Sequence, residues 1–152
     1  MPDFSIITVC YNSSATIAET MRSVVSQTGV TFNHIVKDGG SNDDTTKIAF
    51  RANPGAQIVI SSDKGIYDAM NQGLAEADGD IIGFLNSDDF YAGPNVLETV
   101  LQAFSKGDFD AVYGDLEYIS KQDPNRVVRY WKSGHYSPQR LRNGCMPPTP
   151  AL

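Results

Sequence analysis

The sequence predicts an α/β fold in which a mostly parallel central sheet carries helices on both of its faces. Three observations support this prediction. Short apolar, β-rich segments alternate with longer amphipathic segments along the chain. Polar clusters rich in Gly, Asp, Asn and Ser follow the first four apolar segments. No internal repeat or low-complexity linker divides the 152 residues, so we expect one domain with its own core.

The first half of the chain gives the clearest elements. The apolar run "FSIITVCY" predicts a buried strand over residues 4–11. Residues 14–29 follow as a helix, because apolar residues recur there with helical spacing. These inward residues are Ile17, Met21, Val24 and Val25.

The same alternation continues to residue 107. Further strands are expected over 32–38, 57–61 and 80–87, and further helices over 41–55, 65–79 and 94–107. The inner face of the helix at 65–79 is predicted to carry Ile66, Met70, Leu74 and Ala77. That of the helix at 94–107 is predicted to carry Val96, Val100, Leu101 and Phe104. Two more strand candidates lie at 109–119 and 126–134, and the turn at 120–125 joins them.

Composition excludes several classes of partner and location. The net charge is −6 and no stretch is rich in Lys or Arg, which argues against nucleic-acid binding. No apolar run approaches the roughly 20 residues of a membrane span. The N-terminus has an acid at Asp3 and no basic segment, unlike a secretory signal. With Cys10 and Cys145 interpreted as reduced thiols, these features predict a cytoplasmic protein.

The polar clusters fall where ligands bind in open α/β sheets, beyond the carboxyl ends of the strands. Thr8, Cys10, Tyr11 and Asn12 end or follow the first strand, and Asp38, Gly39 and Gly40 follow the second. Ser61, Ser62, Asp63, Lys64 and Gly65 follow the third strand, and Asn86, Ser87, Asp88 and Asp89 follow the fourth. In a parallel sheet all four groups lie along one edge, so we expect one site there.

The chemistry of these residues favours an anionic ligand held through a cation. The chain lacks a GxxxxGK[ST] loop, and no GxGxxG follows the first strand, which argues against an ATPase or a dehydrogenase. Adjacent carboxylates at Asp88 and Asp89 suit a hard divalent ion, Mg²⁺ or Mn²⁺, which could bridge to a diphosphate. Asp38 could accept hydrogen bonds from a base N–H or a ribose hydroxyl. Gly39 and Gly40 would let the ligand approach the backbone closely.

Four motifs together resemble family 2 glycosyltransferases of the GT-A fold, from about Phe4 to about Tyr118. They are "SIITVCYN", "VKDGGSNDDT", "SDKGIYDAMNQG" and "GDIIGFLNSDD". The resemblance implies a nucleoside diphosphate sugar as donor, usually a uridine one, with Mn²⁺ or Mg²⁺ as cofactor. It also implies transfer with inversion to a glycan or lipid-linked acceptor, in polysaccharide biosynthesis.

Carried over by position, the resemblance assigns a role to each strand end. Asp38 becomes the nucleobase contact, and the segment from Thr8 to Asn12 lines the nucleotide pocket. Asp63, Lys64 and Gly65 lie near the ribose or the diphosphate. The family's DxD motif falls on Asn86, Ser87 and Asp88, with Asp89 following, so Asp88 is the expected metal ligand.

The sequence departs from the family pattern in two ways. Asn86 stands where the family often has aspartate, so the metal would meet one charge fewer. Family members continue with an acceptor-side segment that supplies a carboxylate general base, and no such acidic pair follows Tyr118. We therefore expect a donor-binding domain over 1–134 and the start of an incomplete acceptor-side segment over 135–152. Asp115 is the remaining candidate base, and the truncated edge predicts a homo-oligomer.

Blander interpretations and rival functions stay open at this point. Each acidic cluster alone is as typical of a turn or helix start as of a site, and we assign Asp43 and Asp44 to a helix start. His34 is interpreted as a packing residue. The chain could be a non-catalytic nucleotide-sugar binding module. A nucleotidyltransferase would need a glycine-rich, basic loop after the first strand, and a phospho-acceptor regulator would carry its acids after the first and third strands.

Overall fold

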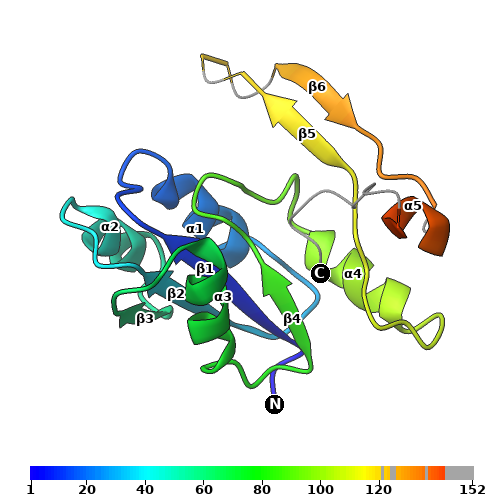
Figure 1. The fold of residues 1–152 in the computed structure, drawn as a ribbon, viewed down its shortest axis with the longest axis horizontal. Coiled ribbons are helices and arrows are strands. Elements are labelled where there is room, and N and C mark those ends of the chain that lie inside the picture. The colour runs from blue at the N-terminus through cyan, green and yellow to red at the C-terminus, as the bar shows by residue number, and fades with distance from the viewer. Residues whose placement is uncertain (121, 124–125, 136, 143–152) are drawn as a thin grey trace.

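The computed structural model describes residues 1–120, 122–123, 126–135 and 137–142. Strands and helices alternate through most of the chain (Figure 1). The elements are β1 (Phe4–Cys10), α1 (Ile17–Val25), β2 (Phe32–Asp38), α2 (Thr45–Ala52), β3 (Gln57–Ile60), α3 (Ile66–Leu74), β4 (Ile81–Phe84), α4 (Val96–Phe104), β5 (Leu116–Ile119), β6 (Val127–Trp131) and α5 (Pro138–Arg142).

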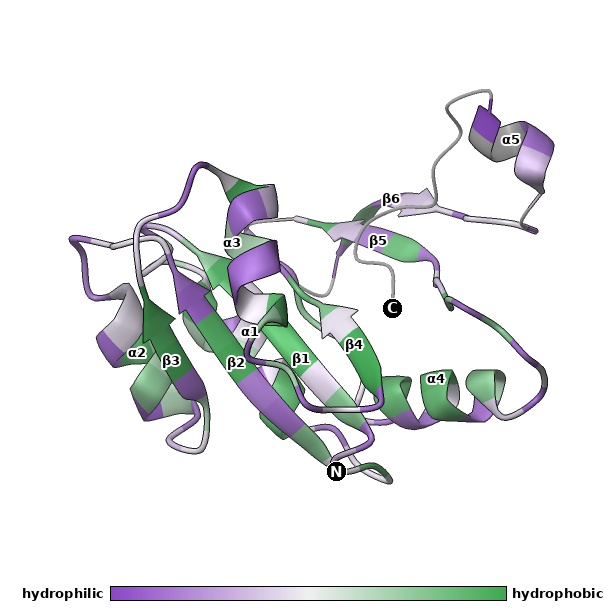
Figure 2. Cartoon of the chain, turned by 60° about the horizontal axis from the view of Figure 1, so that its bottom comes forward, coloured by the Kyte–Doolittle hydropathy of each residue, from purple (hydrophilic) through white to green (hydrophobic). Residues whose placement is uncertain are grey.

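A four-stranded parallel sheet in the order β3-β2-β1-β4 forms the centre of the fold and confirms the predicted α/β class. β1 pairs with β2 along its whole length, from Phe4 opposite Phe32 to Cys10 opposite Asp38. β5 and β6 form a separate antiparallel pair that lies away from this sheet in both views (Figure 1, Figure 2). The division at residue 134 stays a prediction, and residues 143–152 lie outside the described part of the chain.

Helices cover both faces of the sheet, as predicted. Alternate residues of β1 point to opposite faces, and all seven are buried, which is typical of a strand inside a parallel sheet. On one face lie α1, α2 and α4, and on the other lies α3. Figure 2 shows the hydrophobic colour over much of β1 and β4, with polar segments in β2. No helix of the described residues is long and apolar enough to cross a bilayer.

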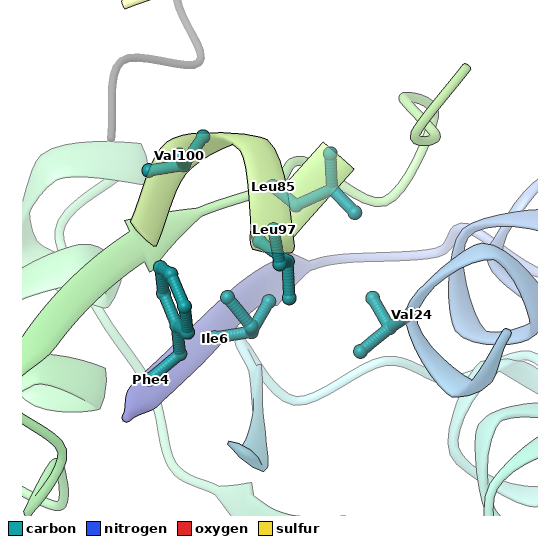
Figure 3. Close-up of a cluster of buried hydrophobic side chains, with 6 residues drawn as sticks. All are labelled: Phe4, Ile6, Val24, Leu85, Leu97 and Val100. Atoms are coloured by element: carbon teal, nitrogen blue, oxygen red, sulfur yellow. The ribbon is translucent and has the colours of Figure 1, made fainter. Parts of the chain in front are cut away.

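The largest hydrophobic cluster joins β1 to α1, α4 and the end of β4 (Figure 3). It consists of Phe4, Ile6, Val24, Leu85, Leu97 and Val100. Leu97 is fully buried on the inner face of α4, whereas Val96, which was predicted there, is only partly buried. The cluster supports the start of the turn that follows β4.

Two predicted inner faces need correction. Val25 of α1 is 50% exposed, because α1 presents Ile17, Met21 and Val24 to the sheet. In α3 the buried residues are Ala69 and Gly73, whereas Ile66 and Leu74 are exposed. The reason is close packing, because a Cβ on Gly73 would lie 2.6 Å from Ile7 Cγ2. Small residues of α3 therefore meet the sheet most closely, while Met70 and Ala77 pack against the hydrophobic cluster that contains Ile7 and Ala69, as their spacing had predicted.

His34 is a packing residue, as predicted. Its side chain is buried, with Nε2 hydrogen-bonded to Thr8 Oγ1 at 2.9 Å and Nδ1 to Asn53 Nδ2 at 3.3 Å. Burial lowers the pKa of His34 to about 4. The ring is therefore neutral near pH 7.

We expect stability to fall as the pH drops from 7 to 5. The unfolded chain protonates His34 near its ordinary pKa of about 6.5, but the folded chain resists protonation, so acid favours unfolding by about 2 kcal/mol over this range. Urea unfolding at both pH values measures the change. His34→Gln removes the titrating ring, so between pH 7 and 5 this variant should lose about 2 kcal/mol less of its free energy of unfolding than the natural protein does. An equal loss in both proteins would contradict the assignment.

Leu97→Ala should lower the free energy of unfolding by about 2–5 kcal/mol, because it leaves a cavity in a fully buried cluster. Val25→Ala is the matched control, since that side chain is half exposed and should cost less than about 1 kcal/mol. Denaturant unfolding of the two variants compares them. Similar losses would mean that the α4 contact with β1 contributes little.

Candidate functional site at the carboxyl edge of the sheet

The four strand ends meet at one edge, and the strand order changes direction there. The chain moves outward from β1 to β2 and β3, and then crosses to β4 on the other side of β1. In open α/β sheets the crevice beyond such a switch point is the usual place for a ligand. The loops after β1, β2, β3 and β4 therefore form the candidate site.

Asp38, at the end of β2, is buried and organises the glycine turn that follows it. Its Oδ1 accepts hydrogen bonds from the backbone N–H groups of Gly40 at 2.9 Å and Ser41 at 2.7 Å. Its Oδ2 accepts from Ser41 Oγ at 2.5 Å and from Cys10 Sγ at 3.4 Å. Both oxygens are thus engaged within the protein, and Gly40 takes the left-handed φ of 90° that the turn requires.

Three residues of the first predicted group also have internal partners. Thr8 lies within β1 and is fully buried, and its hydroxyl is hydrogen-bonded to His34, so its side chain does not reach the edge. The Cys10 thiol is buried against Asp38, and burial is the main reason that its pKa is raised. Asn12, with φ of 50°, donates its N–H to Ser41 Oγ at 2.8 Å and accepts from Asn42 N at 3.0 Å through Oδ1. Asn12 therefore fastens the loop after β1 to the loop after β2.

Tyr11, Gly39 and Asp63 converge at the open part of the edge. Tyr11 is 62% exposed. A Cβ on Gly39 would lie 2.8 Å from Asp63 Oδ2 and 3.4 Å from Tyr11 Cδ2, so only glycine leaves this space free. Three strand ends thus contribute to one wall that combines an aromatic ring, bare backbone and a carboxylate.

Asp63 is held by the start of α3 and by a lysine from β2. Its Oδ1 accepts the N–H of Gly65 at 3.0 Å, and its Oδ2 contacts Lys37 Nζ at 3.2 Å. The Gly65 hydrogen bond and, to a smaller extent, Lys37 lower the pKa of Asp63. Lys64 is exposed, and its N–H donates to Asp68 Oδ2 at 2.9 Å. The predicted Asp63–Gly65 group therefore lies at the edge with its carboxylate ionised.

Lys37, which was not predicted as a site residue, is fully buried beside this wall. Besides Asp63, its ammonium donates to the carbonyl oxygens of Asp38 at 3.0 Å and Ser61 at 2.7 Å. A lysine inside a predicted buried strand was the available signal, because a buried charge needs partners.

The segment after β4 forms a tight turn that carries the two predicted metal ligands. The N–H of Asp89 donates to the carbonyl of Asn86 at 3.0 Å, which closes the turn. Asp88 is exposed at its tip, and Asp89 is partly buried and accepts Asn86 Nδ2 at 3.1 Å. Burial, with a further contribution from Asp88, raises the pKa of Asp89, so a neighbouring cation would stabilise its charged form.

The donor set of this turn fits a hard divalent ion. Two carboxylates are adjacent, and Asn86 Oδ1 is buried without a hydrogen-bond partner among the described residues. Within those residues no three His, Cys, Asp or Glu side chains cluster closely enough to hold a metal. Mg²⁺ takes roughly six oxygen ligands, so an ion at Asp88 and Asp89 would need further oxygens from substrate and water.

A serine pair joins the two halves of the edge. Ser13 Oγ and Ser87 Oγ are hydrogen-bonded at 2.8 Å, and the N–H of Ser13 donates to Thr45 Oγ1 at 2.7 Å. Ser87 is buried. Ser13 was not predicted, because a serine in a loop gives no signal of a partner that lies 74 residues away.

Asp115 lies outside this edge, at the base of the β5–β6 pair. Its carboxylate accepts hydrogen bonds from the Tyr130 hydroxyl, from Ser133 N at 3.0 Å and from Ser133 Oγ at 2.8 Å. These bonds lower its pKa, the Tyr130 bond most of all. A carboxylate that accepts three hydrogen bonds and has a lowered pKa is a weaker proton acceptor than a free one, and the role of Asp115 as general base stays a prediction.

A shallow hollow of about 470 Å³ lies between the starts of α1 and α2. It is lined by Ser14, Ala15, Asn42, Asp43, Asp44, Lys47 and Ile48, none of which was predicted as a site residue. Asp43 accepts hydrogen bonds there from Ser14 N and from Thr45, and Asp44 pairs with Lys47 at 2.8 Å. The two acids do not lie in the first turn of the helix, where the sequence had placed them, because α2 begins at Thr45. Asp44 is the N-cap without a side-chain cap hydrogen bond, and Asp43 accepts the N–H of Thr45 from just before the helix.

Comparisons with known proteins agree with this architecture. The pattern of the family described as Glycosyl transferase family 2 matches residues 5–148. An uncharacterised glycosyltransferase of Mycobacterium tuberculosis is 40% identical over 116 residues, which are 74% of this chain and 44% of that protein. A PGL/p-HBAD biosynthesis glycosyltransferase of Mycobacterium bovis is 37% identical over 76% of this chain and 47% of its own length. The chain thus spans about half the length of these relatives.

Solved structures give the same result. Glucosyl-3-phosphoglycerate synthase from M. tuberculosis, crystallised with Mg²⁺ and UDP, is 25% identical with a TM-score of 0.63, over 74% of this chain and 43% of that one. S. aureus TarS in complex with UDP-GlcNAc shares the fold at 22% identity and a TM-score of 0.69, over 79% of this chain and 36% of that one. The sheet order, the residues at its edge and the family match lead to one conclusion: this chain belongs to glycosyltransferase family 2.

Proposed function

We propose that this chain is the donor-binding part of an inverting glycosyltransferase that takes its sugar from a nucleoside diphosphate sugar, most simply a UDP-sugar. The observation that carries the proposal is the joining of two unlike subsites at one edge. An aromatic and carboxylate wall lies beyond β1, β2 and β3, and a turn with two acids lies beyond β4. A molecule with a nucleoside at one end and a diphosphate at the other matches both.

The nucleoside end would lie against Tyr11, Gly39 and Asp63. The exposed Tyr11 ring offers a stacking surface, Gly39 admits a close approach, and the Asp63 carboxylate can accept an N–H or a hydroxyl. Asp38, Cys10 and Asn12 would shape this pocket from behind. A direct contact between Asp38 and the base would require exchange of one of the hydrogen bonds that the carboxylate now accepts.

The diphosphate would lie at the turn after β4. Asp88 and Asp89 would hold Mn²⁺ or Mg²⁺, which as a Lewis acid neutralises charge on the leaving diphosphate. Asn86 fixes Asp89 through its amide, and Ser87 anchors the turn to the loop after β1. Lys64, exposed on the loop after β3, can approach the phosphates from the other side.

Transfer also requires an acceptor site and a general base, which we place outside the donor-binding domain over residues 1–134. The acceptor would be a glycan or a lipid-linked sugar, in polysaccharide biosynthesis at the cytoplasmic side. Asp115 is a weaker base than a free carboxylate for the reasons given above, which favours a second candidate function for this chain by itself: a nucleotide-sugar binding module without transfer activity. Measurable transfer to any acceptor would eliminate that second candidate.

Asp88→Ala should reduce the Mn²⁺-dependent affinity for UDP by at least about tenfold, because it removes the exposed metal ligand. Calorimetric titration of UDP with Mn²⁺, and again with EDTA, measures this. With EDTA the variant and the natural protein should bind equally weakly. Asp110→Ala, an exposed acid between α4 and β5, is the matched control. Tight binding that ignores both EDTA and the Asp88 substitution would contradict the metal assignment.

Gly39→Ala should weaken UDP binding about tenfold or more while the protein stays folded. The added methyl group would lie 2.8 Å from Asp63 Oδ2 and would occupy the space between that carboxylate and Tyr11. Gly114→Ala is the control, because a Cβ there meets no atom within 4 Å. Equal UDP affinity in both variants would place the nucleoside elsewhere.

A further inference from the structure

Lys37 is the one lysine that the described part of the chain buries completely, and its charge is compensated locally. Its side chain has no exposed surface, and each of the three N–H donors of an ammonium has an acceptor within reach. These acceptors are the carbonyl of Asp38, the carbonyl of Ser61 and the carboxylate of Asp63. Burying a charge is costly unless it is paired and hydrogen-bonded, and these three acceptors meet that requirement.

All three acceptors lie at the carboxyl ends of β2 and β3. The N–H of Ser61 donates to the carbonyl of Asp38 at 3.1 Å as the two strands end. The Lys37 ammonium donates to both carbonyl oxygens, Asp38 O and Ser61 O, and also to the Asp63 carboxylate. It therefore fixes the loop after β3 relative to the glycine turn after β2.

Asp63 is the residue through which Lys37 can affect a ligand. Only 16% of its side chain is exposed, and its Oδ2, the atom that Lys37 contacts, is also the atom that a Cβ on Gly39 would meet first. The charged and titratable groups around it are Lys37 from β2, Tyr11 from the loop after β1, Asp38 at the turn, and Lys64 and Asp68 from its own loop and helix. Asp38 faces Gly40 and Ser41, and Asp68 accepts from Lys64 N and Gln72, so Lys37 is the cation that faces Asp63 directly.

We propose that Lys37 is a positioning residue that holds the Asp63 carboxylate in place against Gly39 and Tyr11, and that it contributes to nucleotide affinity through Asp63. The second half of this statement rests on the proposed function. The rival explanation is that Lys37 only stabilises the fold by tying β2 to β3. The two differ in whether the effect of Lys37 on a ligand depends on Asp63.

The first experiment needs no ligand. The Asp63 carboxyl carbon is titrated by NMR in the natural protein and in Lys37→Met, where the nearest cation has gone. We expect the Asp63 pKa to rise toward its ordinary value in the variant. Lys47→Met is the control, because that lysine pairs with Asp44 at the surface and should leave Asp63 unchanged. An unchanged Asp63 titration in Lys37→Met overturns the proposal.

The second experiment is a double-mutant cycle on UDP affinity with Lys37→Met, Asp63→Asn and the pair, all with Mn²⁺ present. Lys37→Met should weaken binding about tenfold in the natural background, since hydrogen bonds to charged groups are of that strength. In the Asp63→Asn background the same change should cost less than about twofold. As the pH is lowered, UDP binding by the single variant Lys37→Met should weaken at a higher pH than binding by the natural protein, because its Asp63 carboxylate takes up a proton at a higher pH. Equal losses in both backgrounds would overturn the proposal in favour of a purely structural lysine.

Two further outcomes remain decisive. If Lys37→Met does not fold, Lys37→Gln carries both experiments, because it keeps two N–H donors and loses the charge. If the natural protein binds no UDP, the proposed function fails, and with it the role of Lys37 in affinity. The Asp63 titration still decides whether Lys37 positions the carboxylate.

Discussion

The parallel pairing of β1 with β2 is the interaction on which the rest of the structure depends. It runs through seven residue pairs without a register shift and ends with Cys10 opposite Asp38. The loops that follow the two strands therefore begin side by side at the edge of the sheet. The hydrogen bond from the Cys10 thiol to the Asp38 carboxylate and that from Gly39 N to the Cys10 carbonyl then continue the pairing past the last strand residues. A slip by one residue would turn every side chain of β1 to the other face and separate Tyr11 from Gly39 and Asp63.

The sequence was sufficient to predict the order of the elements and the edge of the sheet at which the four polar groups meet. The alternating strands and helices, the polar residues after four strands and the carboxylates at Asp88 and Asp89 all follow from local patterns. Prediction failed where the answer depends on packing between distant segments. For α3 the spacing indicated Met70 and Ala77, which do pack against the sheet, but not Ala69 and Gly73, whose small size allows the close approach to Ile7.

The same limit applies to individual side chains at the site. Residue type and spacing identified Asp38, Asn12 and Cys10, but hydrogen-bond partners decide what they do, and those partners come from other loops. Asp38 uses both carboxylate oxygens to build the glycine turn, whereas the Asp63 carboxylate stays partly exposed beside Gly39 and Tyr11. Ser13 and Lys37 gave weak signals or none, because a hydroxyl or an ammonium acquires its role only from the acceptors that the fold brings to it.

The serine hydrogen bond between the loops after β1 and β4 has an energetic consequence. If Asp88 and Asp89 hold a divalent ion as proposed, the turn supplies only two adjacent carboxylates, and further oxygens would come from substrate and water. Ion and nucleotide would then raise each other's affinity by the same factor, since such coupling is reciprocal. The Ser13–Ser87 hydrogen bond would link the two loops concerned, so that ordering one of them would lower the entropic cost of ordering the other.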